Sequence, residues 1–231
     1  MEILKVDSAF IALEHEIHYP IKILSDAEQE VAEKWNTKRR LEFTGGRVCA
    51  KTALKYLGSK KYRDILRLPD GSPSWPAKVV GSIAHCQDFY AAIVGCSANF
   101  AALGIDVEPN ERLPIHIINR IASNDELNSL KLLHEEQSNL AWDRLLFCAK
   151  EAAFKAIYQG YGQFLTTADM QVLMKSNSTE FIVRYKYREL TKLVELSREV
   201  KGSFKLLHGR LVVFVLICAP SSVEAPLDEL C

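Results

Sequence analysis

The apolar residues of this chain recur with two different periods, which predicts a protein of mixed helices and strands. Three short apolar runs, at 79–84, 90–96 and 101–107, are typical of buried strands. Two longer segments, at 26–56 and 139–159, repeat apolar residues three and four positions apart and are predicted to be helices. Helices packed on sheets in this way indicate an α+β fold.

Weaker patterns complete the expected order of elements. They are a strand within 1–20, helices at 115–122 and 124–135, strands at 180–187, 201–207 and 211–218, a charged helix or loop at 188–200, and a turn-rich loop at 69–76. Ser25 is the expected N-cap of the first long helix. Helices precede strands twice, and the connector 109–114 separates the two sets. We therefore expect halves at 1–110 and 111–231, although no sequence repeat is visible between them.

The composition bounds the functional classes. With 231 residues, 48% of them hydrophobic, the chain can form one substantial domain or two small ones. Its 29 basic and 29 acidic residues balance, so nothing indicates a general nucleic-acid or membrane binder. The longest apolar run, 211–219, is too short to span a bilayer, and no signal peptide is evident. Six dispersed cysteines without a Cys-x-x-Cys pair favour neither zinc nor disulfides, so we expect a cytoplasmic protein.

Three acidic residues carry most of the chemical information. Asp106 and Glu108 are two apart at a predicted strand end, so their side chains point to the same side. Glu151 and Lys155 are four apart on a predicted helix and share a face. Such a set suits a hard divalent cation and a phosphate ester. The alternatives are a solvated strand end and an ordinary helical ion pair worth about 0.2–0.5 kcal/mol, but the apolar surroundings of Glu151 favour a functional site.

A glycine pair interrupts the first long helix. Each of Gly45 and Gly46 costs roughly 1 kcal/mol relative to alanine in a helix interior. This cost predicts that another group, with the ligand as one candidate, closely approaches the backbone there.

The segments around the three acids resemble the two signatures of the 4′-phosphopantetheinyl transferases of the surfactin and enterobactin type. Residues 104–108 read Gly-Ile-Asp-Val-Glu, and residues 147–155 read Phe-Cys-Ala-Lys-Glu-Ala-Ala-Phe-Lys. Upstream stretches at 38–47 and 68–86 are similar to further parts of that family in order and spacing. The resemblance covers about residues 38–160, and the ordered set is more specific than either short motif.

The resemblance implies a fold and a metal site. The fold would consist of two similar α/β halves related by a pseudo-twofold axis, with the ligand between them. Magnesium, which Mn²⁺ could replace, would be held by Asp106, Glu108 and Glu151, and Asp106 would also contact coenzyme A. Lys150 and Lys155 would hold phosphate, and Lys155 would also assist catalysis. Glu151 would act as base toward the attacking serine, either directly or through a metal-bound water.

The resemblance also implies contacts for the nucleotide end of coenzyme A. These would be Arg39, Arg47, Gly71, Pro73, Ser82 and His85. Ser82 and His85 would meet the ribose 3′-phosphate, and a histidine can donate to phosphate near neutral pH. Arg39 and Arg47 are eight apart and so lie on roughly one helix face, where guanidinium groups could bind phosphate and stack on a base. Which of residues 38–40 corresponds to the arginine of the family is left open.

The implied reaction moves the 4′-phosphopantetheine arm of coenzyme A to a serine of an apo acyl or peptidyl carrier protein and releases adenosine 3′,5′-bisphosphate. The alternatives are a metal-dependent nucleotide pyrophosphatase, a catalytically silent coenzyme A-binding module, and a structural domain with chance motifs. Phe147 and Ala84 resemble the enterobactin branch and weakly favour siderophore, nonribosomal-peptide or polyketide carriers. We expect a monomer whose basic rim at Lys51, Lys55 and 60–63 either meets an acidic carrier or is a solvated face.

Overall fold

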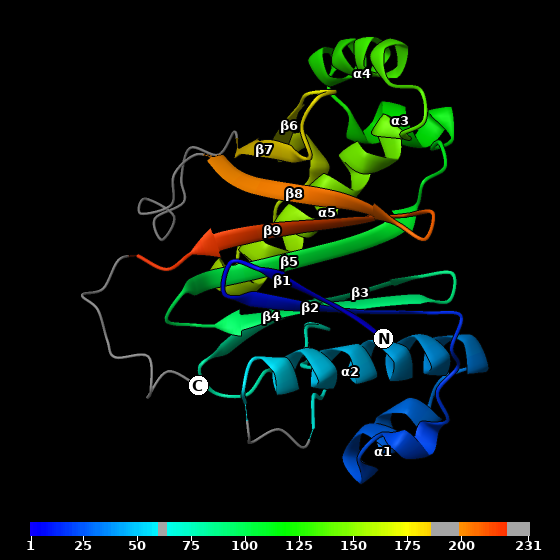
Figure 1. Ribbon diagram of the computed structural model, residues 1–231, viewed down its shortest axis with the longest axis vertical. Helices are drawn as coiled ribbons and strands as arrows, with labels where there is room; N and C mark the ends of the chain where they lie inside the picture. The colour runs from blue at the N-terminus through cyan, green and yellow to red at the C-terminus, as the bar shows by residue number, and fades with distance from the viewer. Residues whose placement is uncertain (60–63, 186–198, 221–231) are drawn as a thin grey trace. The chain divides into compact units, whose positions relative to one another are not determined.

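The computed structural model describes residues 1–59, 64–185 and 199–220. The chain forms two compact units (Figure 1). One unit contains Met1–Leu103 and the chain from Cys218, and the other is Gly104–Ile217. The change of unit at Gly104 falls inside a strand, earlier than the boundary predicted between 110 and 111. The α+β class expected from the sequence is confirmed, since helices and antiparallel sheets occur together in each unit.

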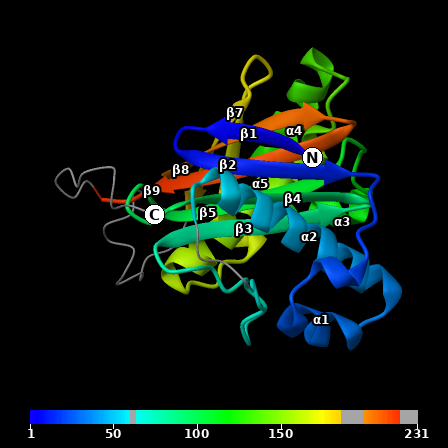
Figure 2. The same cartoon turned by 60° about the horizontal axis from the view of Figure 1, so that its bottom comes forward.

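The first unit is a four-stranded antiparallel sheet with order β1-β2-β4-β3. Its elements are β1 (Glu2–Val6), β2 (Ala9–His15), η1 (Ile21–Ile23), α1 (Asp26–Glu33), α2 (Thr37–Tyr56), β3 (Val79–Cys86) and β4 (Phe89–Cys96). Helix α2 covers one face of this sheet through contacts with β2, β3 and β4, as Figure 2 shows. Small residues on α2 allow the close packing: Ala50 and Ala53 are fully buried against Ala12 and Ala92.

The two helix glycines serve this packing rather than a ligand. A Cβ on Gly45 would lie 2.5 Å from the ring of Tyr90, and one on Gly46 would lie 2.8 Å from Ile83. The close approach predicted at these positions is therefore made by side chains of β3 and β4, and the ligand is not needed to explain it.

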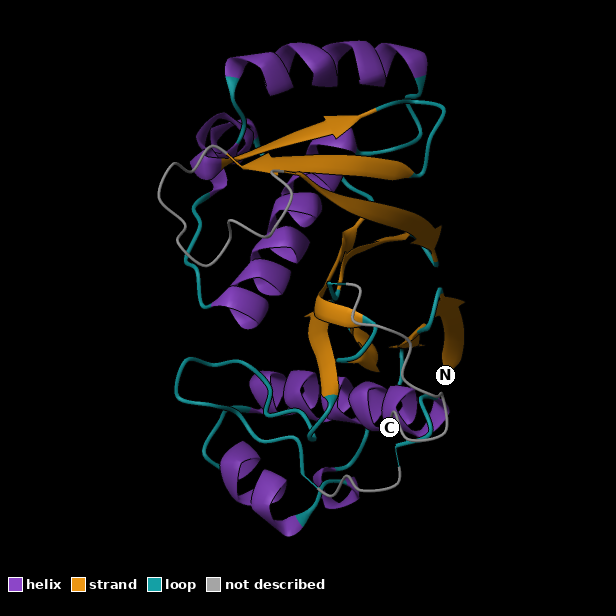
Figure 3. Ribbon diagram, turned by 90° about the vertical axis from the view of Figure 1, so that its left-hand side faces the viewer, coloured by secondary structure: helices purple, strands orange, loops and turns teal. Residues whose placement is uncertain are grey.

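The second unit contains a five-stranded sheet with order β5-β9-β8-β7-β6. Its elements are β5 (Phe100–Pro109), α3 (Ile115–Ile121), α4 (Asn124–Glu136), α5 (Trp142–Tyr161), η2 (Thr167–Asp169), β6 (Met170–Met174), β7 (Glu180–Tyr185), β8 (Glu199–Leu207) and β9 (Arg210–Cys218). Figure 3 shows the helices lying against the strands, and α5 contacts β6, β7 and β8. Helix α5 also approaches β5 so closely that a Cβ on Gly104 would lie 1.9 Å from the carbonyl oxygen of Ala152.

Local capping explains where the observed helices differ from prediction. The segment 26–56 was predicted as one helix but forms two, because Asn36 caps a new helix by accepting from the backbone N–H of Arg39 at 2.9 Å. Ser25 is the N-cap of α1, as predicted. Helix α5 ends at Tyr161 with Gly162 in the left-handed conformation, at φ +66°.

Two strand predictions also needed correction. The single strand expected within 1–20 is the hairpin β1–β2, with Asp7 at φ +52° in the turn. Strand β6 was not predicted. Most of the charged segment predicted at 188–200 lies outside the described residues, as does the basic cluster at 60–63. No helix in the described ranges is long and apolar enough to cross a bilayer.

Candidate active site

Strand β5 and helix α5 bring Asp106 and Lys155 together in the second unit. The Nζ of Lys155 donates to Asp106 Oδ1 at 2.7 Å and to the carbonyl oxygen of Ile105 at 3.0 Å. Asp106 is buried, with 8% of its surface exposed, and its Oδ2 has no hydrogen-bond partner among the described residues. One oxygen of this carboxylate is therefore neutralised, while the other is buried without a hydrogen-bond partner in the described chain, which is costly for a charged group.

Glu108 lies one strand repeat beyond Asp106 and pairs with a residue that the sequence reasoning missed. The Nη1 of Arg144, from the first turn of α5, donates to Glu108 Oε2 at 3.0 Å. Its Nε also donates to the carbonyl oxygen of Glu111 at 2.9 Å, which fixes the guanidinium. A signal was present, because Arg144 precedes Glu151 by seven residues and so lies on the same helical face two turns earlier.

Electrostatics link Asp106 to both glutamates. Burial raises the pKa of Glu151, and the charge of Asp106 raises it further against the opposing effect of Lys155. Burial and Asp106 likewise raise the pKa of Glu108, although Arg144 acts in the opposite direction. Asp106 therefore interacts unfavourably with both glutamates, which is the condition under which a cation bound beside it gains most.

A divalent ion fits this set in its chemistry. Carboxylate oxygens are the ligands that Mg²⁺ prefers, and Asp106 Oδ2 is a buried oxygen that lacks a partner within the described chain. The side chains are not gathered around a point, since no group of three or more potential ligands is close enough for a shared ion in the described ranges. Instead, Lys155 and Arg144 supply the positive charge next to Asp106 and Glu108.

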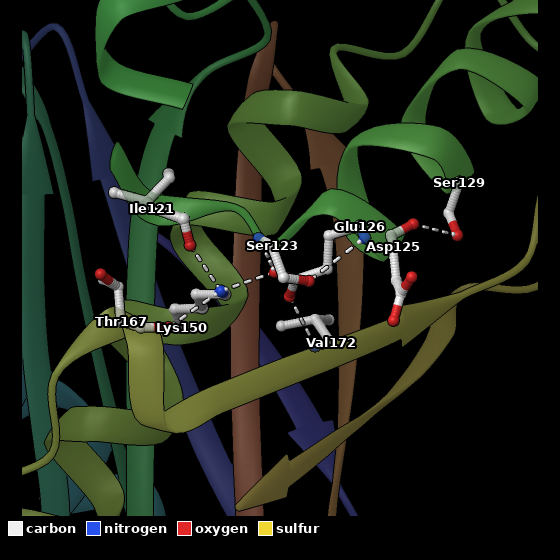
Figure 4. Close-up of polar contacts among 8 residues, drawn as sticks. All are labelled: Ile121, Ser123, Asp125, Glu126, Ser129, Lys150, Thr167 and Val172. Atoms are coloured by element: carbon white, nitrogen blue, oxygen red, sulfur yellow. Dashed lines mark hydrogen bonds and ion pairs between the residues drawn. The ribbon is translucent and has the colours of Figure 1, made fainter. Parts of the chain in front are cut away.

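Lys150 does not point to this site, which contradicts its predicted role at phosphate. Only 1% of its surface is exposed. Its Nζ donates to the carbonyl oxygens of Ile121 and Thr167 at 2.6 and 3.0 Å, and to Glu126 Oε2 at 3.0 Å (Figure 4). An ammonium has three donors, so none is left for a phosphate.

The first unit brings Arg39 and His85 together from α2 and β3. Arg39 Nη1 lies 3.0 Å from His85 Nε2 and donates to Glu42 Oε2 at 3.2 Å. The guanidinium also lies over the ring of Trp35, 5.6 Å from its centroid. Arg40 instead donates to the Trp35 carbonyl oxygen at 3.1 Å. Of the basic residues at 38–40, Arg39 is therefore the one placed with His85.

Arg47 is on the same helix but in a different environment. Its surface is 7% exposed, its Nε donates to the carbonyl oxygen of Ile65 at 2.6 Å, and its guanidinium lies 4.1 Å from the ring centroid of Phe43. Burial lowers the pKa of Arg47 to about 10, which still leaves it charged at neutral pH. Arg47 thus has a structural task besides any contact with a ligand.

Ser82 and His85 do not converge as the resemblance implied. They are three residues apart on β3, and alternate residues of a strand point to opposite faces. Ile83, which shares the face of His85, packs against Gly46 of α2. Ser82 therefore belongs to the opposite face and is buried, with 5% exposure.

The predicted turn around Gly71 and Pro73 exists and is shaped by its own bonds. Gly71 has φ +93°, and its N–H donates to the carbonyl oxygen of Leu68 at 2.9 Å. Asp70 Oδ1 accepts from the backbone N–H of Ser72 at 2.9 Å. Pro73 forms an isolated antiparallel bridge with Arg67. A left-handed position explains the glycine without a ligand.

Comparison with known proteins assigns both parts of the chain to one family. Residues 27–95 match the 4′-phosphopantetheinyl transferase N-terminal domain, and residues 102–206 match the 4′-phosphopantetheinyl transferase superfamily. The chain is 38% identical over 165 residues to 4′-phosphopantetheinyl transferase Svp of Streptomyces mobaraensis, covering 71% of this chain and 67% of that protein.

Two further relatives extend the comparison. The chain is 36% identical over 184 residues to 4′-phosphopantetheinyl transferase PptT of Mycobacterium tuberculosis, covering 78% of this chain and 80% of that protein. It is 32% identical over 164 residues to enterobactin synthase component D of Escherichia coli K12, covering 66% and 74%.

Proposed function

This chain belongs to the 4′-phosphopantetheinyl transferase family, whose members transfer phosphopantetheine from coenzyme A to carrier proteins, and we propose that its own reaction depends on magnesium and releases adenosine 3′,5′-bisphosphate. The observation that carries this proposal is the buried, unpartnered Oδ2 of Asp106 among the described residues, beside two glutamates whose pKa values it raises.

The proposed reaction is a displacement at the β-phosphorus of coenzyme A. The hydroxyl oxygen of the carrier serine forms a bond to that phosphorus, and the bond from phosphorus to the bridging oxygen breaks. The bridging oxygen leaves on adenosine 3′,5′-bisphosphate, and the serine proton goes to a base. Glu151 is the candidate base, because its raised pKa favours proton acceptance and no hydrogen bond within the described chain occupies its carboxylate. It would accept the proton through a water while it serves as a metal ligand, or directly if it gives up that ligand position.

Asp106, Glu108 and Glu151 would hold the magnesium ion, and a bound ion would supply positive charge to the pyrophosphate oxygens. Lys155 is placed to serve the same oxygens. Its ammonium now neutralises Asp106, and a cation on that carboxylate would release it to donate to phosphate. Lys155, rather than Lys150, is therefore the lysine of α5 that we assign to the substrate.

The nucleotide end of coenzyme A would meet the first unit. Arg39 and His85 lie side by side and are half-exposed, with His85 Nε2 accepting from the Arg39 guanidinium. The guanidinium is suited to a phosphate, which could replace this acceptor. The negative charge of Glu42 beside them would keep the pair oriented until the phosphate binds. Arg47 would contribute mainly by shaping the helix and the Ile65 segment around this pair.

Phe147 and Ala84, which resemble the enterobactin branch, favour carriers of siderophore, nonribosomal-peptide or polyketide synthesis. We propose that the protein acts as a cytoplasmic monomer. Within the basic rim considered for carrier docking, Lys55 is exposed, whereas Lys51 is engaged by the buried Glu28. Lys51 is therefore better explained as a structural residue.

Intact-mass spectrometry of an apo carrier protein incubated with this protein, coenzyme A and Mg²⁺ tests the function. A mass gain of one phosphopantetheine unit that disappears on chelation would support transfer and the metal requirement together. Coenzyme A cleaved without carrier modification would indicate a nucleotide pyrophosphatase. Coenzyme A bound but not consumed, with peptide, polyketide and fatty-acid carriers all tried, would indicate a silent binding module.

A further inference from the structure

A fully bonded ion pair joins α4 to α5 in the second unit. Glu126 is the third residue of α4 and completes a capping box with Ser123: its Oε2 accepts from the Ser123 N–H at 2.7 Å. The same oxygen accepts from Lys150 Nζ at 3.0 Å, and Oε1 accepts from the backbone N–H of Val172 in β6 at 2.8 Å. Figure 4 shows the charges facing each other between the two helices.

The first unit contains the same arrangement at different residues. Glu28 is the third residue of α1, and its Oε2 accepts from the N–H of the N-cap Ser25 at 3.1 Å. This oxygen also accepts from Lys51 Nζ of α2 at 2.5 Å, and Oε1 accepts from the backbone N–H of Ile65 at 2.8 Å. Glu28 is fully buried.

The two glutamates agree in every partner, although Lys150 also donates to two backbone carbonyl oxygens and is more deeply buried than Lys51, which is 21% exposed. In each, a Ser-x-x-Glu capping box begins a helix, the buried glutamate binds a lysine from the next long helix, and its second oxygen binds a backbone N–H that follows that helix. The residue after the lysine differs, because Thr52 follows Lys51, whereas Glu151 follows Lys150. In the first unit the arrangement therefore forms with no candidate catalytic acid next to the lysine in the chain. The buried position of Lys150 is explained in the same way by its ion pair, without a bound phosphate.

We propose that the Glu126–Lys150 ion pair is a positioning device for Glu151, and this inference rests on the proposed function. Consecutive residues of an α-helix differ by about 100° in direction. Fixing Lys150 between Ile121, Thr167 and Glu126 therefore sets the rotation of α5. Glu151 shares a helix face with Lys155, which binds Asp106 at 2.7 Å, so this rotation directs Glu151 toward the side of Asp106. A buried ion pair whose hydrogen bonds are all made favours one arrangement of its surroundings, because any shift leaves a charge unpaired.

The duplicated arrangement supplies a matched control. The test compares the double variant Glu126→Gln/Lys150→Met with Glu28→Gln/Lys51→Met. Removing both charges avoids an unpaired buried ion, and glutamine keeps an acceptor for a backbone N–H. Thermal unfolding measures the loss of stability in each variant. Electron paramagnetic resonance of free Mn²⁺, in the presence of coenzyme A and without a carrier, measures metal affinity.

Both variants should unfold at lower temperatures than the wild type. Only the Glu126/Lys150 variant should also bind Mn²⁺ more weakly, by about 10- to 100-fold, as is typical when a group that orients a metal ligand is lost. Its kcat should fall while its KM for coenzyme A changes less than about twofold, because the substrate contacts remain. Unchanged Mn²⁺ affinity in this variant, an equal loss in both variants, or a rise in KM alone would overturn the proposal.

Chemical labelling of the native protein tests the competing phosphate role of Lys150 even if the Glu126/Lys150 variant fails to fold. Reductive methylation followed by peptide mass spectrometry should modify Lys155, which is 29% exposed, and leave Lys150, which is 1% exposed. Labelling of Lys150 in the free protein, with protection by coenzyme A, would restore its phosphate role and overturn the proposal. Because neither Mn²⁺ binding nor labelling requires a carrier, both results remain readable if transfer itself is not found.

Discussion

Lys155 and Asp106 form an ion pair of 2.7 Å that ties the middle of α5 to β5. The pair leaves the second carboxylate oxygen of Asp106 buried and without a partner in the described chain. Lys155 thus neutralises one oxygen of this carboxylate in the structure. A divalent ion held by Asp106 would supply positive charge to this carboxylate, and Lys155 would then be able to donate to a phosphate of the substrate.

Replacing Asp106 by alanine should abolish transfer without unfolding the protein. The variant loses the carboxylate on which both the metal and Lys155 depend, and we expect kcat/KM to fall by roughly 10³-fold, the scale of losing a group that stabilises transition-state charge. Carrier mass shift over time measures the rate, and circular dichroism checks the fold. Turnover like that of the wild type in saturating Mg²⁺ would rule out the metal assignment. Asp106→Asn is the control that keeps the volume but removes the charge.

The magnesium dependence should shift with pH. Burial and the charge of Asp106 raise the pKa values of Glu108 and Glu151, so protons compete with the cation at a higher pH than for an ordinary glutamate. As pH falls, the Mg²⁺ concentration for half-maximal rate should therefore rise. Initial rates measured on a grid of pH and Mg²⁺ would show the acidic limb moving to lower pH as Mg²⁺ increases. An acidic limb that stays fixed at all Mg²⁺ concentrations would contradict competition at these carboxylates.

Glu151→Gln should stabilise the metal-free protein near neutral pH while it removes activity. The folded pKa of Glu151 is raised, so its contribution to stability is complete below the pKa of the unfolded chain and is lost as pH rises through the folded pKa. Glutamine does not titrate, and the gain at pH 7 should be about 1 kcal/mol, typical of relieving strain at a functional site. The gain should vanish below about pH 4, where a glutamate is protonated in both states. Urea unfolding in the presence of a chelator at pH 7 and at about pH 4 measures the free energy of unfolding of the variant and the wild type. If the variant is more stable by the same amount at both pH values, the gain does not come from the ionisation of Glu151.

The two arginines of α2 should separate binding from stability. Arg39 has 41% of its side chain exposed, so Arg39→Gln should raise the KM for coenzyme A with little change in unfolding temperature. Arg47 is buried on Phe43 and bonded to the Ile65 carbonyl oxygen. Arg47→Gln should therefore lower the free energy of unfolding by about 1–3 kcal/mol, in addition to any rise in the KM for coenzyme A. Steady-state kinetics and urea unfolding of both variants test this. A loss confined to kcat in either variant would argue against a role in coenzyme A binding.

The sequence predicted what depends on local periodicity. The apolar runs located β3, β4 and β5, and the two-residue spacing placed Asp106 and Glu108 on one side of a strand end. The same reasoning could have corrected the role of Ser82, because a spacing of three from His85 puts the two on opposite faces of a strand.

The rest of the site depends on partners that are distant in the sequence. The ion pair of Lys150 with Glu126 spans 24 residues. The Ser-x-x-Glu pattern of the capping box at Glu126 is local and visible in the sequence, but nothing local shows that Lys150 binds this glutamate. The spacing of seven residues shows that Arg144 and Glu151 share a face of the helix. The bond from Arg144 to Glu108 could not be predicted, because it forms only when α5 packs on β5. The glycine pair at 45 and 46 signalled close approach, and only the fold shows that Tyr90 and Ile83 make it.

Arg144 should matter through Glu108. Arg144→Met removes the 3.0 Å bond to Glu108 and leaves that carboxylate opposed by Asp106, so the pKa of Glu108 should rise further. The Mg²⁺ concentration for half-maximal rate should then rise more between pH 8 and pH 6 in the variant than in the wild type. The rates of the variant and the wild type should converge at high Mg²⁺. Arg144→Lys keeps the charge but loses the fork that also binds the Glu111 carbonyl oxygen, and it should lie between the two. If Arg144→Met instead lowers the rate equally at every pH and Mg²⁺ concentration, the arginine acts on α5 as a whole rather than on the ionisation of Glu108.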